Sequence, residues 1–297
     1  MLGISILTFC LNHITPGDPA VLILKAQGVE PTQEMVLALH QEMRLDEPLY
    51  QQYGHWLWGI LHLDLGNSYT TGNSVSEEFF SCFPATLELA LASMGFILLF
   101  SIPSGILAAL YRRSSIDHLS RLAALIGASM PSFWLGLLLI FVFAVKLHWL
   151  PVSGRGGLRH LLLPTITLGF GMAAIYARLL RASLLDVLGQ EYIKVARAKG
   201  LLNKLLIGRH ALKNALLPAL TLFGISLGSL LGGAAIVETI FSWPGIGKLA
   251  VDSIFNRDYP MIQFYGLFMA VVFVFANLLV DISYAALDPR VRLERKS

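Results

Sequence analysis

The stretch ATLELALASMGFILLFSIPSGILAAL, residues 85–110, carries a single charged side chain, Glu88, near its beginning. About 20 consecutive apolar residues in a helix are enough to cross a hydrocarbon layer about 30 Å thick. The whole chain has 297 residues, of which 55% are hydrophobic and 14% are charged, and its mean hydropathy is +0.65. Since a helix satisfies its own backbone hydrogen bonds inside a bilayer, these features predict an all-α membrane protein.

Four further stretches are long and apolar enough to span a membrane: residues 122–147, 161–180, 215–237 and 263–287. A sixth, residues 2–14, is apolar but covers only about 20 Å at the helical rise. It also lacks the basic start and cleavage site of a signal peptide. We therefore expect residues 1–15 to be the remnant of a first transmembrane helix that begins before this numbering, which makes about six helices. Residues 85–297 then form a five-helix transmembrane core.

Residues 16–84 are too long for a simple connection and hold more acidic than basic side chains. Thr32 is a suitable N-cap for a helix that places Met35, Leu39 and Met43 on one face. A second helical pattern begins near Pro48 and carries two tryptophans, which favour a membrane–water boundary. We predict that residues 16–84 form a small external helical cap.

Basic residues predict which loops face the cytosol, because loops on the cytosolic side of a membrane carry an excess of lysine and arginine. If the loops after the second and fourth spans and the C-terminus are cytosolic, 15 of the 22 lysines and arginines lie inside. These are Arg112, Arg113, Arg121, Arg178, Arg181, Lys194, Arg197, Lys199, Lys204, Arg209, Lys213, Arg290, Arg292, Arg295 and Lys296. The sequence thus predicts a multi-pass protein with both termini in the cytosol.

The most basic loop contains EYIKVARAKGLLNKLLIGRHALKNALLP, residues 191–218, with six basic residues and one acid. Its residues 195–200 are typical of a short helix of small side chains that ends at Gly200, because glycine tolerates a left-handed C′ position. One interpretation is a solvated, topology-determining loop. The other is a docking helix, whose small side chains let another protein approach closely while the bases fix its orientation.

This loop resembles the cytosolic loop of bacterial ABC-importer permeases, whose general pattern is matched literally at Ala196, Gly200 and Leu212. The peptide- and nickel-importing subfamily has a similar sequence, YIKVARAKG…RHALKNALLP, and the resemblance extends over nearly the whole chain. It includes TPGDPA, FPATLELA, MPSFWLG, FSWPGIGKLAVDSIFNRDYPMIQ and NLLVDISYAALDPRVR. Details such as ATLELA, IFNRDYP and LHWLP look most like the nickel or metallophore branch, with dipeptide permeases close behind.

The resemblance implies a type I ABC-importer permease in the bacterial inner membrane, acting on nickel or a metal chelate. The alternative is a permease for di- or oligopeptides. Implied partners are a second homologous permease, two ATP-binding subunits, an external substrate-binding protein and membrane lipid. The loop at about 184–214 would couple ATP hydrolysis to transport through Tyr192, Lys194, Val195, Ala196, Arg197, Ala198, Lys199, Gly200, His210 and Leu212.

An ATP site needs a glycine-rich cradle that ends in Gly-Lys-Ser/Thr. The one Gly-Lys pair, Gly247-Lys248, is followed by Leu249. We therefore predict that this chain is not an enzyme and holds no cofactor, with ATP and Mg²⁺ on partner subunits. A net charge of +3 gives no reason to expect nucleic acid. An ion-coupled secondary transporter, the alternative from another class, would show repeats and midplane charges that are not evident here.

Candidate pathway residues lie in the last two spans and before the final hairpin. Gly224, Gly228, Ser229 and Gly232 permit either close helix packing or the lining of a path. Glu238 precedes a Pro-Gly break and is a candidate for an entrance gate. Asp281 shares a helix face with Asn277, and serves either a structural hydrogen bond or the path. His55 and His62, seven residues apart, are weak metal candidates whose alternative is an interfacial role.

Overall fold

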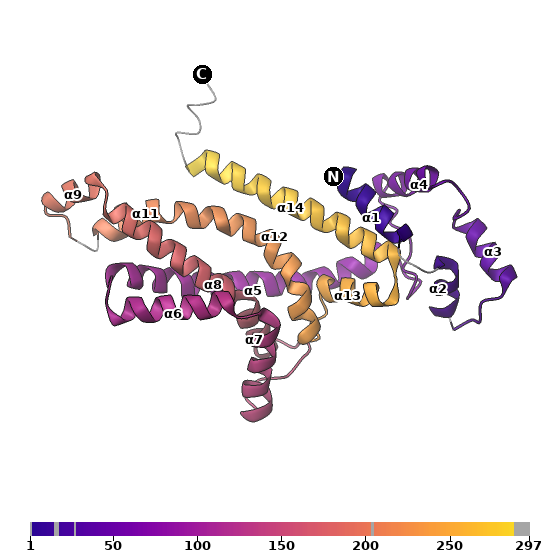
Figure 1. Cartoon of the computed structure of the whole chain (residues 1–297), viewed down its shortest axis with the longest axis horizontal. Coiled ribbons are helices and arrows are strands. Elements are labelled where there is room, and N and C mark those ends of the chain that lie inside the picture. Colours follow the sequence, from indigo (N-terminus) through magenta and orange to yellow (C-terminus); the bar gives the residue numbers. More distant parts are fainter. Residues whose placement is uncertain (1, 15–17, 27, 203–204, 288–297) are drawn as a thin grey trace, which may run out of the picture. The chain divides into compact units, whose positions relative to one another are not determined.

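The computed structural model describes residues 2–14, 18–26, 28–202 and 205–287, and its regular structure there is helical (Figure 1). Within these ranges the β pairing is limited to one isolated antiparallel bridge between Asn67 and Ser74. The chain divides into two compact units. Unit 1 is Met1–Ala85 with Pro244–Val272, and unit 2 is Thr86–Trp243 with Phe273–Ser297. The predicted domain boundaries at residues 15 and 84 stay a prediction.

Unit 1 is built from short helices and the first parts of two long ones. They are α1 (Leu2–Ile14), α2 (Pro19–Ala26), α3 (Gln33–Glu42), α4 (Leu49–Leu61), α13 (Ile246–Asn256), and the starts of α5 (Val75–Leu110) and α14 (Tyr259–Leu287). Phe79 is fully buried at its centre and meets Phe264 and Phe268 edge-on, with ring centroids 4.7 and 4.8 Å apart. Such aromatic pairs add to the burial of apolar surface, so this cluster holds α5 against α14.

The two helices predicted for the cap are confirmed as α3 and α4. Thr32 caps α3 as expected, accepting a hydrogen bond at 3.4 Å from the Met35 N–H. Helix α1 lies against α4, where the Phe9 and Tyr53 rings pack edge-on at 5.3 Å and Ser5 shares a 2.8 Å hydrogen bond with the Tyr53 hydroxyl. The helix α2 was not predicted, because its eight residues are too few to show a clear periodicity.

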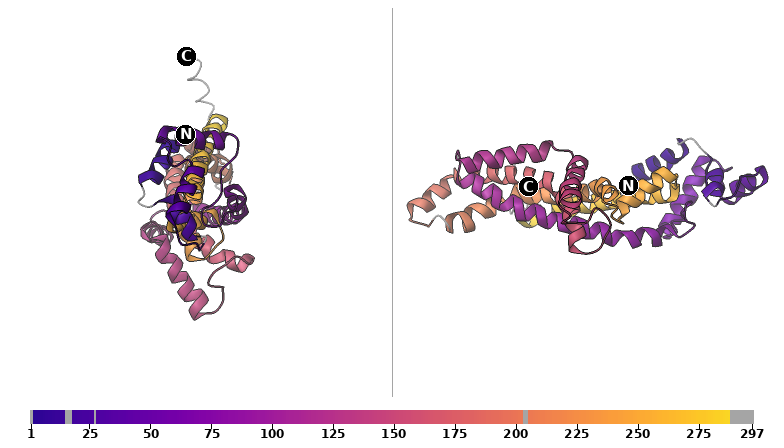
Figure 2. Two further views of the ribbon diagram at one scale, coloured as in Figure 1. Left: turned by 90° about the vertical axis from the view of Figure 1, so that its right-hand side faces the viewer. Right: turned by 90° about the horizontal axis from the view of Figure 1, so that it is seen from below.

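Unit 2 contains the rest of α5 and most of the long helices. In order they are α6 (Ser115–Ser129), α7 (Ser132–Leu139), η1 (Ile140–Lys146), α8 (Leu158–Leu188), α9 (Glu191–Ala198), η2 (Leu206–Ala211), α11 (Leu212–Ala215) and α12 (Leu217–Ile240). Helix α8 packs against α6, α7 and α12. A Cβ on Gly127 of α6 would lie 2.7 Å from the Ala174 Cβ, so glycine lets α6 approach α8 closely. Figure 2 gives two further views of the helices.

The predicted span over residues 122–147 is not one continuous helix. Helix α6 ends at Ser129, and the chain turns by 104° before it continues through α7 and the π-helical η1 (Figure 1). Pro131 has no N–H to continue the helix, and it disfavours a helical conformation at the residue before it. Met130 accordingly adopts extended backbone, with ψ at 122°.

Three single helices of the described part are long and apolar enough to cross a membrane: Val75–Leu110, Leu158–Leu188 and the first 20 residues of α14, Tyr259–Leu278. The bent pair makes up to four. The predicted spans near 85–110, 161–180 and 263–287 are thus confirmed as continuous helices. Helix α12 covers residues 217–237 of the predicted 215–237 span, and α1 is a 13-residue helix. The predicted count of six spans is not confirmed.

Candidate functional site

The basic loop, defined here as Glu191–Leu216, begins with α9, which ends in the way that the sequence predicts. Gly200 has φ at +81°, the left-handed conformation that favours glycine. Its N–H donates to the Arg197 carbonyl at 3.0 Å, and the Leu201 N–H donates to the Ala196 carbonyl at 3.3 Å. These two bonds form a Schellman motif, which satisfies carbonyls that the helix end would leave free.

The inner face of the basic loop is apolar and anchored. Ile193 is fully buried in a cluster with Leu184 of α8 and Ala109 of α5, and Ala196, Leu201 and Leu212 pack against the same cluster. Two of the predicted coupling residues, Ala196 and Leu212, therefore support the loop from within. Burial of this apolar surface fixes α9 against the ends of α5 and α8.

The outer face of the basic loop is exposed and carries the remaining predicted coupling residues: Tyr192, Lys194, Val195, Arg197, Ala198, Lys199, Gly200 and His210. Lys194 pairs with Glu191 at 2.7 Å, but both side chains are largely exposed, so the pair adds little stability. The Asn214 amide donates to the Tyr192 hydroxyl at 2.8 Å and thereby links α9 to α11. A short helix with small and basic side chains is thus presented on a rigid support.

A buried ion pair that the sequence analysis did not identify lies at the start of α6. The Asp117 carboxylate, 1% exposed, accepts hydrogen bonds from Arg181 Nε at 2.6 Å and Nη2 at 2.9 Å, and from the Arg113 N–H at 2.9 Å. Ser114 caps α6 by accepting from the Asp117 N–H. The sequence contains the Ser-x-x-Asp pattern of a helix start at Ser114. Nothing in it indicates that Asp117 pairs with Arg181, 64 residues further along the chain.

The pathway candidates on α12 and α14 are only partly covered by the structure. Gly228 is buried, and a Cβ there would lie 3.1 Å from the Phe273 ring, so α12 and α14 approach closely at this point. Gly232 is exposed. The surroundings of Gly224, Ser229 and Asp281 lie outside the described residues, and the roles of all five stay predictions.

Glu238 lies in the last turn of α12 and is fully buried. Its Oε1 accepts a 2.6 Å hydrogen bond from the Thr86 hydroxyl of α5, and its carbonyl accepts from the Trp243 N–H at 2.8 Å. Nearby, Arg155 pairs with Glu88 at 2.6 Å and lies over the Trp243 ring, 6.0 Å from its centroid. The predicted helix break follows, since α12 ends at Ile240.

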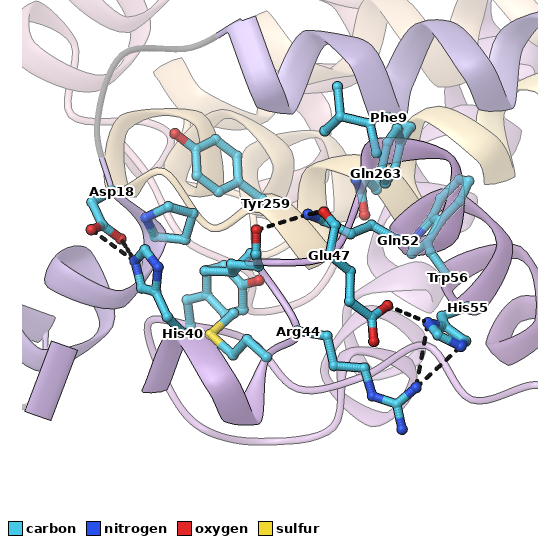
Figure 3. Close-up of a pocket in the computed structure, with 15 residues that line it drawn as sticks. Phe9, Asp18, His40, Arg44, Glu47, Gln52, His55, Trp56, Tyr259 and Gln263 are labelled. Carbon is cyan, nitrogen blue, oxygen red and sulfur yellow. Dashed lines mark hydrogen bonds and ion pairs between the residues drawn. The ribbon is translucent and has the colours of Figure 1, made fainter. Parts of the chain in front are cut away.

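A cavity of about 580 Å³ lies within unit 1, lined mostly by residues of the predicted cap together with Phe9 of α1 and Tyr259 and Gln263 of α14 (Figure 3). His40 and Asp18 form an ion pair on its wall, with Nε2 2.8 Å from Oδ1. This hydrogen bond raises the pKa of His40 above its ordinary value, assisted by the neighbouring Asp46. Aromatic rings also line the cavity, from Phe9, Trp56, Tyr69 and Tyr259. The cavity therefore has both charged and aromatic side chains on its walls.

His55 and His62 have separate partners. His55 Nδ1 lies 3.1 Å from Glu47 Oε2, while His62 Nδ1 is 2.9 Å from the Trp58 carbonyl. Among the described residues, no group of three or more histidine, cysteine and acidic side chains could hold a metal ion. The geometry gives no support to the weak metal candidates.

Two family models match the chain. One, described as binding-protein-dependent transport system inner membrane component, matches residues 101–293; a second, for the N-terminal part of such membrane components, matches residues 1–90. Together they cover the sequence apart from residues 91–100 and 294–297.

Curated relatives are similar over almost their full length. The di/tripeptide transport system permease protein DppB of Pseudomonas aeruginosa (strain UCBPP-PA14) is 43% identical over 321 residues, covering 99% of this chain and 95% of the relative. The glutathione transport system permease protein GsiC of Escherichia coli O6:H1 is 43% identical, covering 97% and 94%. The dipeptide transport system permease protein DppB of Escherichia coli K12 is 41% identical, covering 98% and 94%.

Solved structures agree on the fold. The MetNI methionine ABC transporter in an inward-facing conformation has a TM-score of 0.59 at 19% identity, covering 71% of this chain and 96% of that one. An amino acid ABC transporter with histidines has a TM-score of 0.52 at 17% identity, covering 72% and 94%. At these identities the likeness supports the type I importer permease fold and nothing about the transported molecule.

Proposed function

Because the chain belongs to the binding-protein-dependent transport system inner membrane component family, we propose that it forms part of an import path for short peptides. It is a multi-pass inner-membrane permease subunit of an ABC importer. Four further points are proposals: the substrate, the orientation in the membrane, the partner subunits and the residues that couple ATP hydrolysis to transport.

One observation carries the choice of substrate: 41–43% identity over nearly the full length to permeases named for dipeptides, di/tripeptides and glutathione. All three are short peptides or modified peptides. We therefore propose short peptides, the alternative given in the sequence analysis, as the substrate in place of the predicted nickel. The lack of a metal-binding group among the described residues agrees with that choice. The ion-coupled alternative is not supported by the family match.

The basic loop is the proposed contact for the ATP-binding subunits. Its inner face is held by an apolar cluster, and its outer face presents Val195, Ala198 and Gly200 between basic side chains. Small side chains allow a close approach, and a force applied to α9 would pass to α5 and α8 through Ile193. We therefore assign the outer face, rather than Ala196 and Leu212, to direct contact.

The arrangement in the membrane follows from the distribution of basic residues. With 15 of the 22 lysines and arginines on one side, the basic loop and both termini face the cytosol, and the cap faces outward. A substrate-binding protein would then deliver the peptide on the cap side. A second permease would complete the path, and two ATP-binding subunits with ATP and Mg²⁺ would act from the cytosolic side.

Uptake of two labelled substrates tests the proposal. A strain that lacks the gene is compared with the same strain carrying it, using radiolabelled Ala-Phe and ⁶³Ni²⁺. We expect the gene to restore energy-dependent accumulation of the peptide and leave that of nickel unchanged. Restored nickel uptake with unchanged peptide uptake would contradict the peptide proposal and favour nickel as the substrate.

A further inference from the structure

The cavity in unit 1 is of the size that small-molecule sites have. Its volume is about 580 Å³, and known ligand pockets measure about 300–1,000 Å³. Its lining comes from α1, α2 with the preceding Asp18, α3, α4 and α14, and from the segments between α3 and α4 and between α4 and α5. Because several separate segments form its walls, the cavity depends on the tertiary structure of unit 1 and not on the conformation of a single loop.

A buried hydroxyl without a hydrogen-bond partner in the described part of the chain lines this cavity. Tyr259 is 6% exposed, and its buried hydroxyl has no hydrogen-bond partner among the described residues. Gln263, one turn further along α14, is 8% exposed. Folded proteins rarely leave a buried hydroxyl unpaired, because its lost hydration is not replaced. The Tyr259 hydroxyl therefore leaves a hydrogen-bonding position at this cavity that a water or a polar group of a ligand can fill.

The aromatic side of the cavity is held in place by Asp258. Its carboxylate accepts hydrogen bonds from the Ser68 hydroxyl and from the Tyr69 N–H, the latter at 3.1 Å. The Tyr69 ring then stands perpendicular to the Tyr259 ring, with centroids 6.3 Å apart. On the other side, Trp56 and Phe9 pack together at 6.0 Å. These rings offer a preformed apolar surface for a side chain of the bound molecule.

Charges of both signs surround the aromatic surface (Figure 3). Glu47 Oε2 is buried and, although 3.1 Å from the His55 Nδ1, it accepts no hydrogen bond within the described ranges. Arg44 Nη1 lies 3.1 Å from the His55 Nε2. A histidine does not neutralise a guanidinium, so Arg44 keeps the capacity to bind a carboxylate. Glu47 keeps the capacity to bind an ammonium group.

We propose that this cavity binds a short peptide, with Glu47 at the peptide ammonium group, Arg44 at its carboxylate and a side chain against the aromatic rings. An amino acid or short peptide carries one group of each sign together with a side chain, and the proposed peptide import favours a zwitterion of two or three residues. The inference rests on the proposed peptide import and adds a substrate site within unit 1 of the permease.

Photolabelling of the complete transporter tests the site. The transporter is isolated by a tag on this chain, placed in lipid nanodiscs without its binding protein, and irradiated with alanyl-p-benzoylphenylalanine. We expect mass spectrometry to find the label on cavity residues such as Met43. Excess Ala-Phe should abolish the labelling, and N-acetyl-Ala-Phe amide, which lacks both charges, should not.

Single substitutions locate the contacts. Glu47→Gln and Arg44→Gln should each weaken the competition by Ala-Phe about tenfold, the loss of one charge-assisted hydrogen bond. Tyr259→Phe, which removes only the hydroxyl, should weaken it less. Glu34→Gln, an exposed change outside the cavity, is the matched control and should have no effect.

Two outcomes would overturn the site. One is labelling elsewhere, with none in the cavity; the other is cavity labelling that both Glu47→Gln and Arg44→Gln leave unchanged. If the same transporter still imports Ala-Phe, the site fails while the proposed function stands. Failure of the proposed function is read separately, from the absence of peptide uptake in cells.

Discussion

Arg181 of α8 holds Asp117 of α6 with two hydrogen bonds, and the carboxylate they share is almost fully buried. These hydrogen bonds connect the first turn of α6 to the part of α8 that leads into the basic loop. A motion of α9 would therefore reach α6 through this pair as well as through apolar packing.

Replacement of Asp117 by asparagine should destabilise the protein, because Arg181 would lose its charged partner. Loss of hydrogen bonds to a charged group corresponds to about 2 kcal/mol. We expect a lower melting temperature of the purified transporter and less assembled complex in the membrane. Glu191→Gln, which removes the exposed partner of Lys194, should change neither quantity. Equal melting temperatures for the two variants would show that the buried pair is dispensable.

Close packing of α6 and α8 predicts opposite effects at two glycines. Gly127→Ala places a methyl group 2.7 Å from the Ala174 Cβ and should destabilise by about 1–3 kcal/mol through overpacking. Gly95→Ala on α5 meets no atom within 4 Å and should be neutral or stabilise the helix by about 0.5–1 kcal/mol. Thermal unfolding in detergent compares them, and a stable Gly127→Ala variant would mean that α6 and α8 are further apart than described.

The ion pair between His40 and Asp18 predicts a pH dependence in the cap. The pKa of His40 is raised in the folded protein, so its stabilising effect is complete below the ordinary pKa of about 6.5. The effect is lost as the pH rises through the raised value. Hydrogen exchange of α3 amides, corrected for intrinsic rates, should therefore show less protection at pH 8.5 than at pH 6. His40→Gln should remove this difference; a difference that persists would assign it to another group.

The orientation can be tested with single cysteines after Cys10 and Cys82 are replaced. We expect Gln33→Cys in the cap to react with an impermeant maleimide in intact cells, because the cap faces outward. Lys199→Cys in the basic loop should react only after the cells are opened. Reaction of Lys199→Cys in intact cells would mean that the topology is inverted.

Much of the helical content could be predicted because apolar spans depend on composition alone. The end of α9 at Gly200 and the cap of α3 at Thr32 were predicted correctly, since both are set by local backbone chemistry. The sharp bend at Pro131 was missed because the hydropathy on either side of it is uniform. A proline within an apolar run can be accommodated, as Pro164 is within α8, or can break the helix.

The parts of the site that depend on long-range contacts could not be predicted. Arg181 was counted among the cytosolic basic residues and Asp117 was not singled out, because nothing in either local sequence indicates the other. The cavity in unit 1 is lined by residues as far apart as Phe9 and Gln263, so it exists only once the chain has folded. Family resemblance predicted the permease correctly but pointed to nickel, since peptide and nickel permeases share the same loop and span motifs.

The central claim is that the basic loop transmits ATP hydrolysis to the transport path, and Gly200→Val tests it most directly. Valine is strained at a φ of +81°, by about 1–3 kcal/mol, and should disturb the end of α9 without a steric clash. Gly28→Val in the cap, with φ at +74° and equally open surroundings, is the matched control.

ATP hydrolysis and Ala-Phe uptake are measured together in proteoliposomes that contain the complete transporter and its binding protein. We predict that Gly200→Val retains its ATP-binding subunits but loses most of its uptake per ATP hydrolysed, while Gly28→Val keeps the wild-type ratio. Wild-type uptake per ATP in Gly200→Val, with the ATP-binding subunits normally bound, would contradict the account.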